Sequence, residues 1–157
     1  TKVMAERLIL EANPDTLIVR PRLPISEIPH PRNTLDKLAR YEFINDVQES
    51  VTIVEDFLPA LKELIEGERS GGYNMVNLGT ISPHEIAKEM GHPHKVWSKK
   101  VQNQVLKEQN RARRVTTYVG TKRIDNPTMP DVRNRIKEVV KKWHDARSIQ
   151  PGTSFNQ

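Results

Sequence analysis

Apolar side chains recur every three or four residues along several stretches of the chain, and this spacing predicts amphipathic helices. The predicted helices cover residues 2–12, 33–42, 55–68 and 130–147, and a polar helix is expected over 99–110. The helix over 130–147 places five apolar side chains on one face: Val132, Ile136, Val139, Val140 and Trp143. These faces are expected to pack against a common core.

Short β-branched or alternating runs between the helices predict strands over residues 16–20, 50–53 and 73–77. Two further short strands are expected at 95–97 and 115–120. Strands that alternate with helices indicate an α/β fold. The sheet supplied here is small, and it would need other strands to lie against.

Polar and glycine residues mark where two helices begin and end. Ser82 stands three residues before Glu85, which is the pattern of an N-cap with a capping box. Gly91 is expected to end that helix, and Gly71 and Gly72 are expected to break the helix that precedes them.

The composition removes several classes of protein. The chain has 157 residues and no cysteine, which excludes a disulfide scaffold, a cysteine nucleophile and a thiolate metal site within it. No apolar run approaches the roughly 18 residues of a membrane span, so we expect a cytoplasmic protein without a membrane partner.

The charge is distributed unevenly. Residues 1–78 have a net charge of −4, whereas residues 79–157 have a net charge of +9. A basic half favours a phosphate-bearing partner, either a nucleic acid or a nucleotide-linked small molecule. With only 5% aromatic residues, a stacking platform for single-stranded nucleic acid is poorly supplied.

No complete catalytic motif is present, and the candidate metal ligands are unconvincing. His84, His92 and His94 are close in sequence, but surface histidines are the favoured interpretation, so no metal is expected. Glu55 and Asp56 open a helix, where acidic side chains favour the positive end of the dipole.

The segment ISPHEIAKEMGHPHKVWSKKV, residues 81–101, resembles the helix-turn-helix of bacterial repressors. It combines a capped helix, a glycine turn and a segment around Val96 in basic surroundings. A small basic DNA-binding protein is therefore the alternative hypothesis, although specific nucleic-acid binding is not our expectation.

A second resemblance covers more of the chain. GGYNMVNLGTISPHEI, residues 71–86, resembles the GxYNxxNxGxxSHxEI stretch of extended short-chain dehydrogenases/reductases, in the dTDP-4-dehydrorhamnose reductase branch. It is most similar to the nucleotide-rhamnose synthases, which are 3,5-epimerase/4-reductases. KVMAERLI, LIVRPRLPIS, HPRNTLDKLARY and SVTIVEDFLPAL match further segments of the same family in the same order.

The resemblance implies the C-terminal portion of a Rossmann-type NAD(P)-binding fold together with a small α/β substrate-binding subdomain. Residues 1–30 would end the dinucleotide-binding domain, residues 31–147 would form the substrate-binding region, and 148–157 would be a flexible tail. The resemblance also implies that the chain is part of a nucleotide-sugar reductase. Such an enzyme would reduce the C4 keto group of a 4-keto-6-deoxy sugar nucleotide with NADPH or NADH.

The resemblance also assigns residues. Lys2 falls on the lysine of the Tyr-x-x-x-Lys pair. In the family this lysine lowers the pKa of the tyrosine and binds the nicotinamide ribose. Pro24, Ile25 and Ser26 would lie against the nicotinamide. Asn33 would contact the sugar or its diphosphate, and Arg113 would pair with the diphosphate.

The family's tyrosine and glycine-rich loop would lie before Thr1, so this chain alone is expected to be inactive. An N-terminal half or a homodimer partner would complete it. The sequence leaves open whether the nucleotide is dTDP or UDP, and whether the cofactor is NADH or NADPH.

Overall fold

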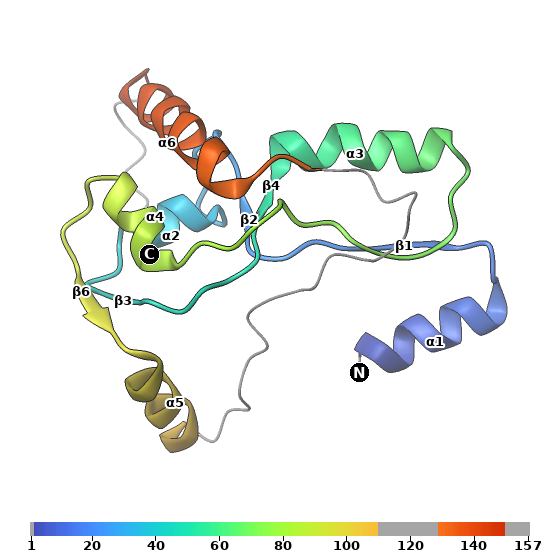
Figure 1. The fold of residues 1–157 in the computed structure, drawn as a ribbon, viewed down its shortest axis with the longest axis horizontal. Coiled ribbons are helices and arrows are strands. Elements are labelled where there is room, and N and C mark those ends of the chain that lie inside the picture. The colour runs from blue at the N-terminus through green and yellow to red at the C-terminus, as the bar shows by residue number, and fades with distance from the viewer. Residues whose placement is uncertain (1, 110–128, 150–157) are drawn as a thin grey trace.

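The computed structural model describes residues 2–109 and 129–149 of the chain (Figure 1). Its helices are α1 (Lys2–Ala12), α2 (Thr34–Leu38), α3 (Val54–Glu66), α4 (Pro83–Glu89), α5 (Lys99–Glu108) and α6 (Val132–Ile149). Its strands are β1 (Leu17–Arg20), β2 (Pro24–Ile25), β3 (Phe43–Asn45), β4 (Thr52–Ile53), β5 (Gly71–Asn74) and β6 (Lys95–Trp97).

The described strands form three parallel pairs rather than one wide sheet. β1 pairs with β5, β2 with β4, and β3 with β6. In the longest pair, Leu17 lies opposite Gly71 and Arg20 lies opposite Asn74. Parallel strands connected through helices confirm the predicted α/β class.

The β1–β5 unit consists of this strand pair with α3 on one side and α1 on the other (Figure 1). Its core is a cluster of five buried residues: Ala60, Leu64, Tyr73, Met75 and Met129. Leu17 and Val19 of β1 pack against that cluster. By contrast, α1 contains no buried residue.

The α2–α4–α6 unit consists of these three helices with the short strands β2, β3 and β4, and it contains the larger core. Trp143 is 1% exposed within that core. All five side chains predicted to point inward from the last helix are buried there. The indole nitrogen of Trp143 donates to Asp36 Oδ2 at 3.0 Å, which ties α6 to α2. A buried aromatic residue with a satisfied polar atom fixes one orientation of the helix.

The capping box predicted at the start of α4 is confirmed. Ser82 Oγ accepts a hydrogen bond from the Glu85 backbone at 3.1 Å, and Glu85 Oε2 accepts one from the Ser82 backbone at 2.8 Å. The helix ends before Gly91, whose φ of +67° belongs to the left-handed region that glycine adopts readily.

Two expectations about local structure were wrong. Gly71 and Gly72 do not break α3; the helix ends at Glu66, and both glycines lie in β5. The helix predicted over 33–42 is only five residues long, because bonds such as Arg40 N to Lys37 O tighten its end into a turn. The expected strand over 115–120 lies outside the described residues.

The helix-turn-helix hypothesis is also wrong. The segment that would enter the major groove forms β6, with Val96 paired in register to Ile44 of β3. A strand hydrogen-bonded to β3 cannot act as a recognition helix. In the part of the chain that is described, no helix is long and apolar enough to cross a lipid bilayer.

Candidate functional site

The loop after β1 is held by a side chain from α2. Asn33, the N-cap of α2, is 7% exposed, and its Nδ2 donates to the backbone oxygens of Ser26 at 2.8 Å and Ile28 at 3.0 Å. Its Oδ1 accepts from the backbone of Ser26 and Leu35, both at 3.3 Å. The Asn33 amide therefore fixes the shape of the loop.

A carboxylate from α3 holds the same loop from another direction. Glu55 Oε1 accepts the Ser26 hydroxyl at 2.7 Å and the Glu27 backbone N–H at 3.1 Å. Thr34 Oγ1 donates to the Pro24 carbonyl at 2.7 Å. Three side chains, two from the start of α2 and one from α3, thus position residues 24–28. Each of these hydrogen bonds lowers the conformational freedom of the loop.

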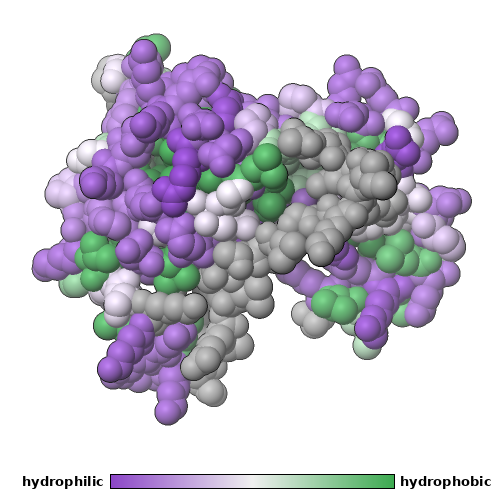
Figure 2. All heavy atoms as spheres, in the orientation of Figure 1, coloured by the Kyte–Doolittle hydropathy of each residue, from purple (hydrophilic) through white to green (hydrophobic). Residues whose placement is uncertain are grey.

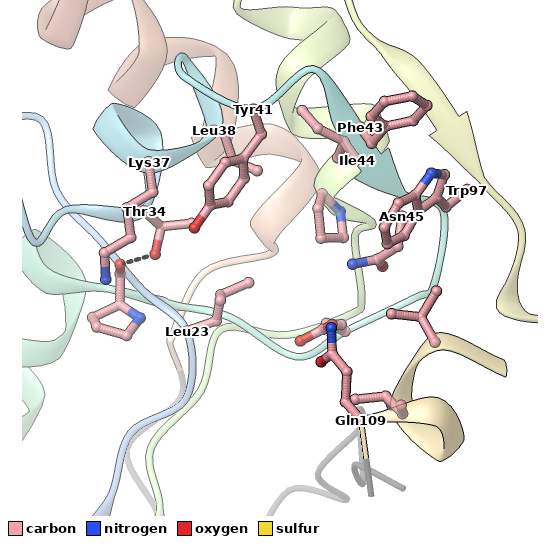
Figure 3. A pocket seen from close by; sticks show the side chains of 15 residues that line it. Leu23, Thr34, Lys37, Leu38, Tyr41, Phe43, Ile44, Asn45, Trp97 and Gln109 are labelled. Carbon is pink, nitrogen blue, oxygen red and sulfur yellow. Dashed lines mark hydrogen bonds between the residues drawn. The ribbon is translucent and has the colours of Figure 1, made fainter. Parts of the chain in front are cut away.

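A pocket of about 500 Å³ lies between this loop, α2, the β3–β6 pair and α5 (Figure 3). Its walls are largely apolar: Leu23, Pro24, Leu38, Phe43, Ile44, Pro83, Trp97, Val105 and Leu106. Polar groups are also present on the walls: Thr34, Lys37, Tyr41, Asn45, Glu49 and Gln109. Apolar walls with a few polar groups are typical of small-molecule sites.

Several of these polar groups have no partner of their own. Within the described residues, no hydrogen bond or ion pair involves the Lys37 ammonium, the Tyr41 hydroxyl or the Gln109 amide. Asn45 Oδ1 accepts from the Val47 backbone at 3.2 Å, which leaves its Nδ2 donor unused. Glu49 differs, because Arg22 pairs with its carboxylate at 3.0 Å. The pocket therefore offers donors to a ligand.

The start of α1 lies at the carboxyl end of the β1–β5 sheet. Glu6, one helical turn after Lys2, accepts hydrogen bonds from Arg20 at 2.9 and 2.6 Å. Arg20 ends β1, and it also donates to Asn74 at the end of β5, at 3.4 Å. The hydrogen bonds from Arg20 hold the pKa of Glu6 below its usual value. Lys2 shares a helix face with Glu6, because residues four apart lie one above the other.

The predicted site residues lie in several different environments. Pro24 lines the pocket, Ile25 is fully buried, and Ser26 faces Glu55. Lys2 is exposed and does not line the pocket. Asn33 is engaged with the loop, and its predicted role toward the substrate stays a prediction.

Arg113 lies outside the described residues, and the roles assigned to the other predicted residues likewise remain predictions.

Sequence reasoning missed most of the pocket. Lys37 and Tyr41 fall within the matched segment HPRNTLDKLARY, so their positions were available, but nothing marked them as ligand-facing. Asn45, Trp97 and Gln109 come from elements far apart in the chain. Only the tertiary arrangement brings them together.

The three histidines considered as metal ligands form no metal cluster in the described ranges. His84 Nδ1 and His94 Nε2 lie 2.8 Å apart and share a hydrogen bond, and His94 Nδ1 donates to the His92 carbonyl at 2.7 Å. These bonds link α4 to the segment before β6.

No family model matches the chain. Its sequence is 28% identical over 149 residues to the uncharacterized protein L780 of Acanthamoeba polyphaga mimivirus, covering 90% of this chain and 50% of that protein. The crystal structure of the L780 UDP-rhamnose synthase superposes with a TM-score of 0.72 at 27% identity, over 87% of this chain and 49% of that one.

A bifunctional dTDP-4-dehydrorhamnose 3,5-epimerase/dTDP-4-dehydrorhamnose reductase of Arabidopsis thaliana is 39% identical over 87 residues. That match covers 55% of this chain and 29% of the plant protein. The chain is a partial homologue of this reductase and synthase family. It spans about half the length, or less, of the relatives it matches.

The fold agrees with the family at lower identity. A dTDP-4-dehydrorhamnose reductase of Bacillus anthracis, solved in complex with NADP, has a TM-score of 0.60 at 18% identity. The match covers 89% of this chain and 51% of that chain. At 18% identity this match shows only that the two chains share a fold.

Proposed function

We propose that this chain supplies the nucleotide-sugar-binding part of an NAD(P)H-dependent reductase. The reaction is reduction of the C4 keto group of a 4-keto-6-deoxy sugar nucleotide in rhamnose biosynthesis. In this proposal residues 1–30 end the dinucleotide-binding domain, residues 31–147 form the substrate-binding region and residues 148–157 form a tail. The chain's relation to the 4-reductases supports the reaction class.

One placement carries the proposal: the pocket and Lys2 both lie toward the carboxyl end of the β1–β5 sheet. The pocket begins at Leu23, three residues beyond the last residue of β1, and the Glu6–Arg20 pair brings the start of α1 to that same end. Ligands of parallel α/β sheets bind outside the carboxyl ends of the strands. A hydride donor and its substrate could therefore meet there.

Lys2 and residues 24–26 fit the nicotinamide end of an NAD(P)H cofactor. Lys2 has an exposed ammonium group, and residues 24–26 are held in one conformation by Asn33 and Glu55. When bound, the nicotinamide supplies the hydride. Lys2 would bind its ribose, and the loop would lie along the ring and shield it from water.

The 157 residues on their own are expected not to catalyse reduction. Among these residues there is no glycine-rich loop of the kind that binds a dinucleotide. Without such a loop the pyrophosphate of the hydride donor has no site of its own on these residues. Oxidation of NAD(P)H by the purified chain, in the presence of a UDP-linked or dTDP-linked 4-keto-6-deoxy sugar, would overturn this part of the proposal.

Substrate binding tests the rest of it. Isothermal titration of the chain with UDP and dTDP should show saturable binding to one or both. Val105→Trp fills the pocket from α5 and should abolish that binding. Val101→Trp is the matched control, because Val101 lies one turn earlier on the same helix and does not line the pocket. Absence of pyrimidine-nucleotide binding by the unmodified chain contradicts the proposal.

A further inference from the structure

The pocket is asymmetric in its chemistry. Figure 3 shows Lys37 and Thr34 on one side, Asn45 and Trp97 on the opposite side, and the Tyr41 ring between them. One side therefore has a cation, whereas the other has an aromatic face and an amide. A nucleotide sugar has the matching asymmetry, with a diphosphate in its middle and a base at one end.

Lys37 is the pocket's cation available to a ligand. Among the described residues no carboxylate pairs with it, and Glu49, the acidic residue of the lining, is already paired with Arg22 at 3.0 Å. An ammonium group without a carboxylate partner attracts phosphate oxygens, because no ion pair within the protein has to be broken when they bind.

Thr34 and Lys37 lie one helical turn apart on α2, and the Thr34 hydroxyl is bonded to the Pro24 carbonyl at 2.7 Å. The cation is thereby set beside the loop that, under the proposed function, lies along the nicotinamide. A sugar attached to a diphosphate at Lys37 would extend toward Pro24, where the hydride is delivered. The base would extend the other way.

The opposite side suits a pyrimidine. The Trp97 ring is braced by Phe43, with centroids 5.5 Å apart and planes 39° from each other. Asn45 Oδ1 already accepts from the Val47 backbone, whereas no described residue accepts from its Nδ2, so the donor is the group that Asn45 offers to a ligand. A lone donor pairs with a carbonyl oxygen, such as O4 of uracil or thymine, and cannot pair with the amino group of cytosine.

From these contacts we infer that the pocket binds a uracil or thymine nucleotide sugar in one orientation, with Lys37 on the diphosphate and Asn45 on the base. This inference rests on the proposed function. It makes Lys37 and Asn45 substrate-positioning residues, with Lys37 recognising phosphate and Asn45 distinguishing one pyrimidine from another.

The test compares uridine, UMP, UDP and CDP on the same protein by isothermal titration. Lys37→Gln should weaken UDP binding by about tenfold or more, the loss expected for a hydrogen bond to a charged group, and leave uridine binding unchanged. Lys37→Arg should restore most UDP affinity. Lys88→Gln, an exposed lysine of α4 outside this pocket, is the control and should change neither affinity.

Asn45→Ala should weaken uridine, UMP and UDP by the same factor and reduce the preference for UDP over CDP. Salt gives a readout on the unmodified chain, since UDP binding should fall with ionic strength more steeply than uridine binding. The inference is overturned if Lys37→Gln weakens uridine as much as UDP, or if UDP and uridine respond equally to salt. Failure of the unmodified chain to bind UDP or dTDP overturns the proposed function itself.

Discussion

The two helices at the ends of the described chain have similar apolar periodicity but very different surroundings. In α6, five of 18 residues are buried, and Trp143 bonds to Asp36 of α2. In α1, none of 11 residues is buried, and Met4 and Leu8 are 61% and 58% exposed. Figure 2 shows apolar patches on the part of the surface formed by α1. Periodicity therefore marks which face of a helix can be buried, whereas burial needs a surface that covers it.

The same contrast extends to the units that contain these helices. The α2–α4–α6 unit has a core cluster of 15 buried residues, whereas the β1–β5 unit has five. The units are joined by Asn77, which accepts from Ile53 N at 2.8 Å and donates to Asp56 at 2.7 Å and to the Pro130 carbonyl at 3.0 Å. We expect the larger core to dominate the free energy of unfolding, because stability follows buried apolar area.

The largest effect is expected at the centre of the larger core. Trp143→Ala should lower the free energy of unfolding by about 3–5 kcal/mol, because it removes a fully buried indole and leaves a cavity. Urea denaturation followed by circular dichroism measures this loss. Trp97→Ala, at a half-buried indole of the pocket, is the matched control and should cost clearly less. Equal losses at the two positions would show that α6 does not anchor the core.

Sequence reasoning succeeded where a signal is contained within one helix. The buried face of α6 and the capping box of Ser82 and Glu85 depend on residues three or four positions apart. Such spacings lie within one or two helical turns, so they can be recognised in the sequence without knowledge of the fold.

The rest of the structure depends on contacts between distant segments. β2 and β3 are two and three residues long, too short to show any alternation, and they exist because β4 and β6 pair with them. Gly71 and Gly72 resemble helix breakers in the sequence, because their pairing with β1 depends on a segment about 50 residues away. The pocket was missed for the same reason, since Lys37 and Trp97 line one pocket only because the β3–β6 pair forms.

A smaller effect is expected from acid. The hydrogen bond from Arg133, helped by the Ser82 backbone and Gln48, lowers the pKa of Glu85 from 4.5 to about 2. A carboxylate with a lowered pKa stabilises the fold above pH 4.5, and this contribution is lost as the pH falls from 4.5 toward 2. Because the pair is largely solvent-screened, Glu85→Gln should cost about 1 kcal/mol at neutral pH.

Urea titrations at several pH values measure the effect. The difference between the unmodified chain and Glu85→Gln should shrink as the pH falls through this window. Glu89→Gln is the control, because Glu89 is an exposed acid of the same helix with no described partner. A difference that stays constant down to pH 2 would mean that the Arg133 pair does not stabilise α4.

The smallest effect on stability is expected on α1, where the contrast between the two units is sharpest. Leu8→Gln replaces an exposed leucine, so the free energy of unfolding should change by less than about 0.5 kcal/mol. Self-association should nevertheless fall, because exposed apolar patches promote contacts between copies. Sedimentation velocity over a range of concentrations measures this. Ile149→Gln is the control: Ile149 is 79% exposed at the end of α6, away from the α1 stripe, and its replacement should leave association unchanged. A loss of about 2 kcal/mol for Leu8→Gln, as for a buried leucine, would show that α1 packs as tightly as α6 and would remove the contrast.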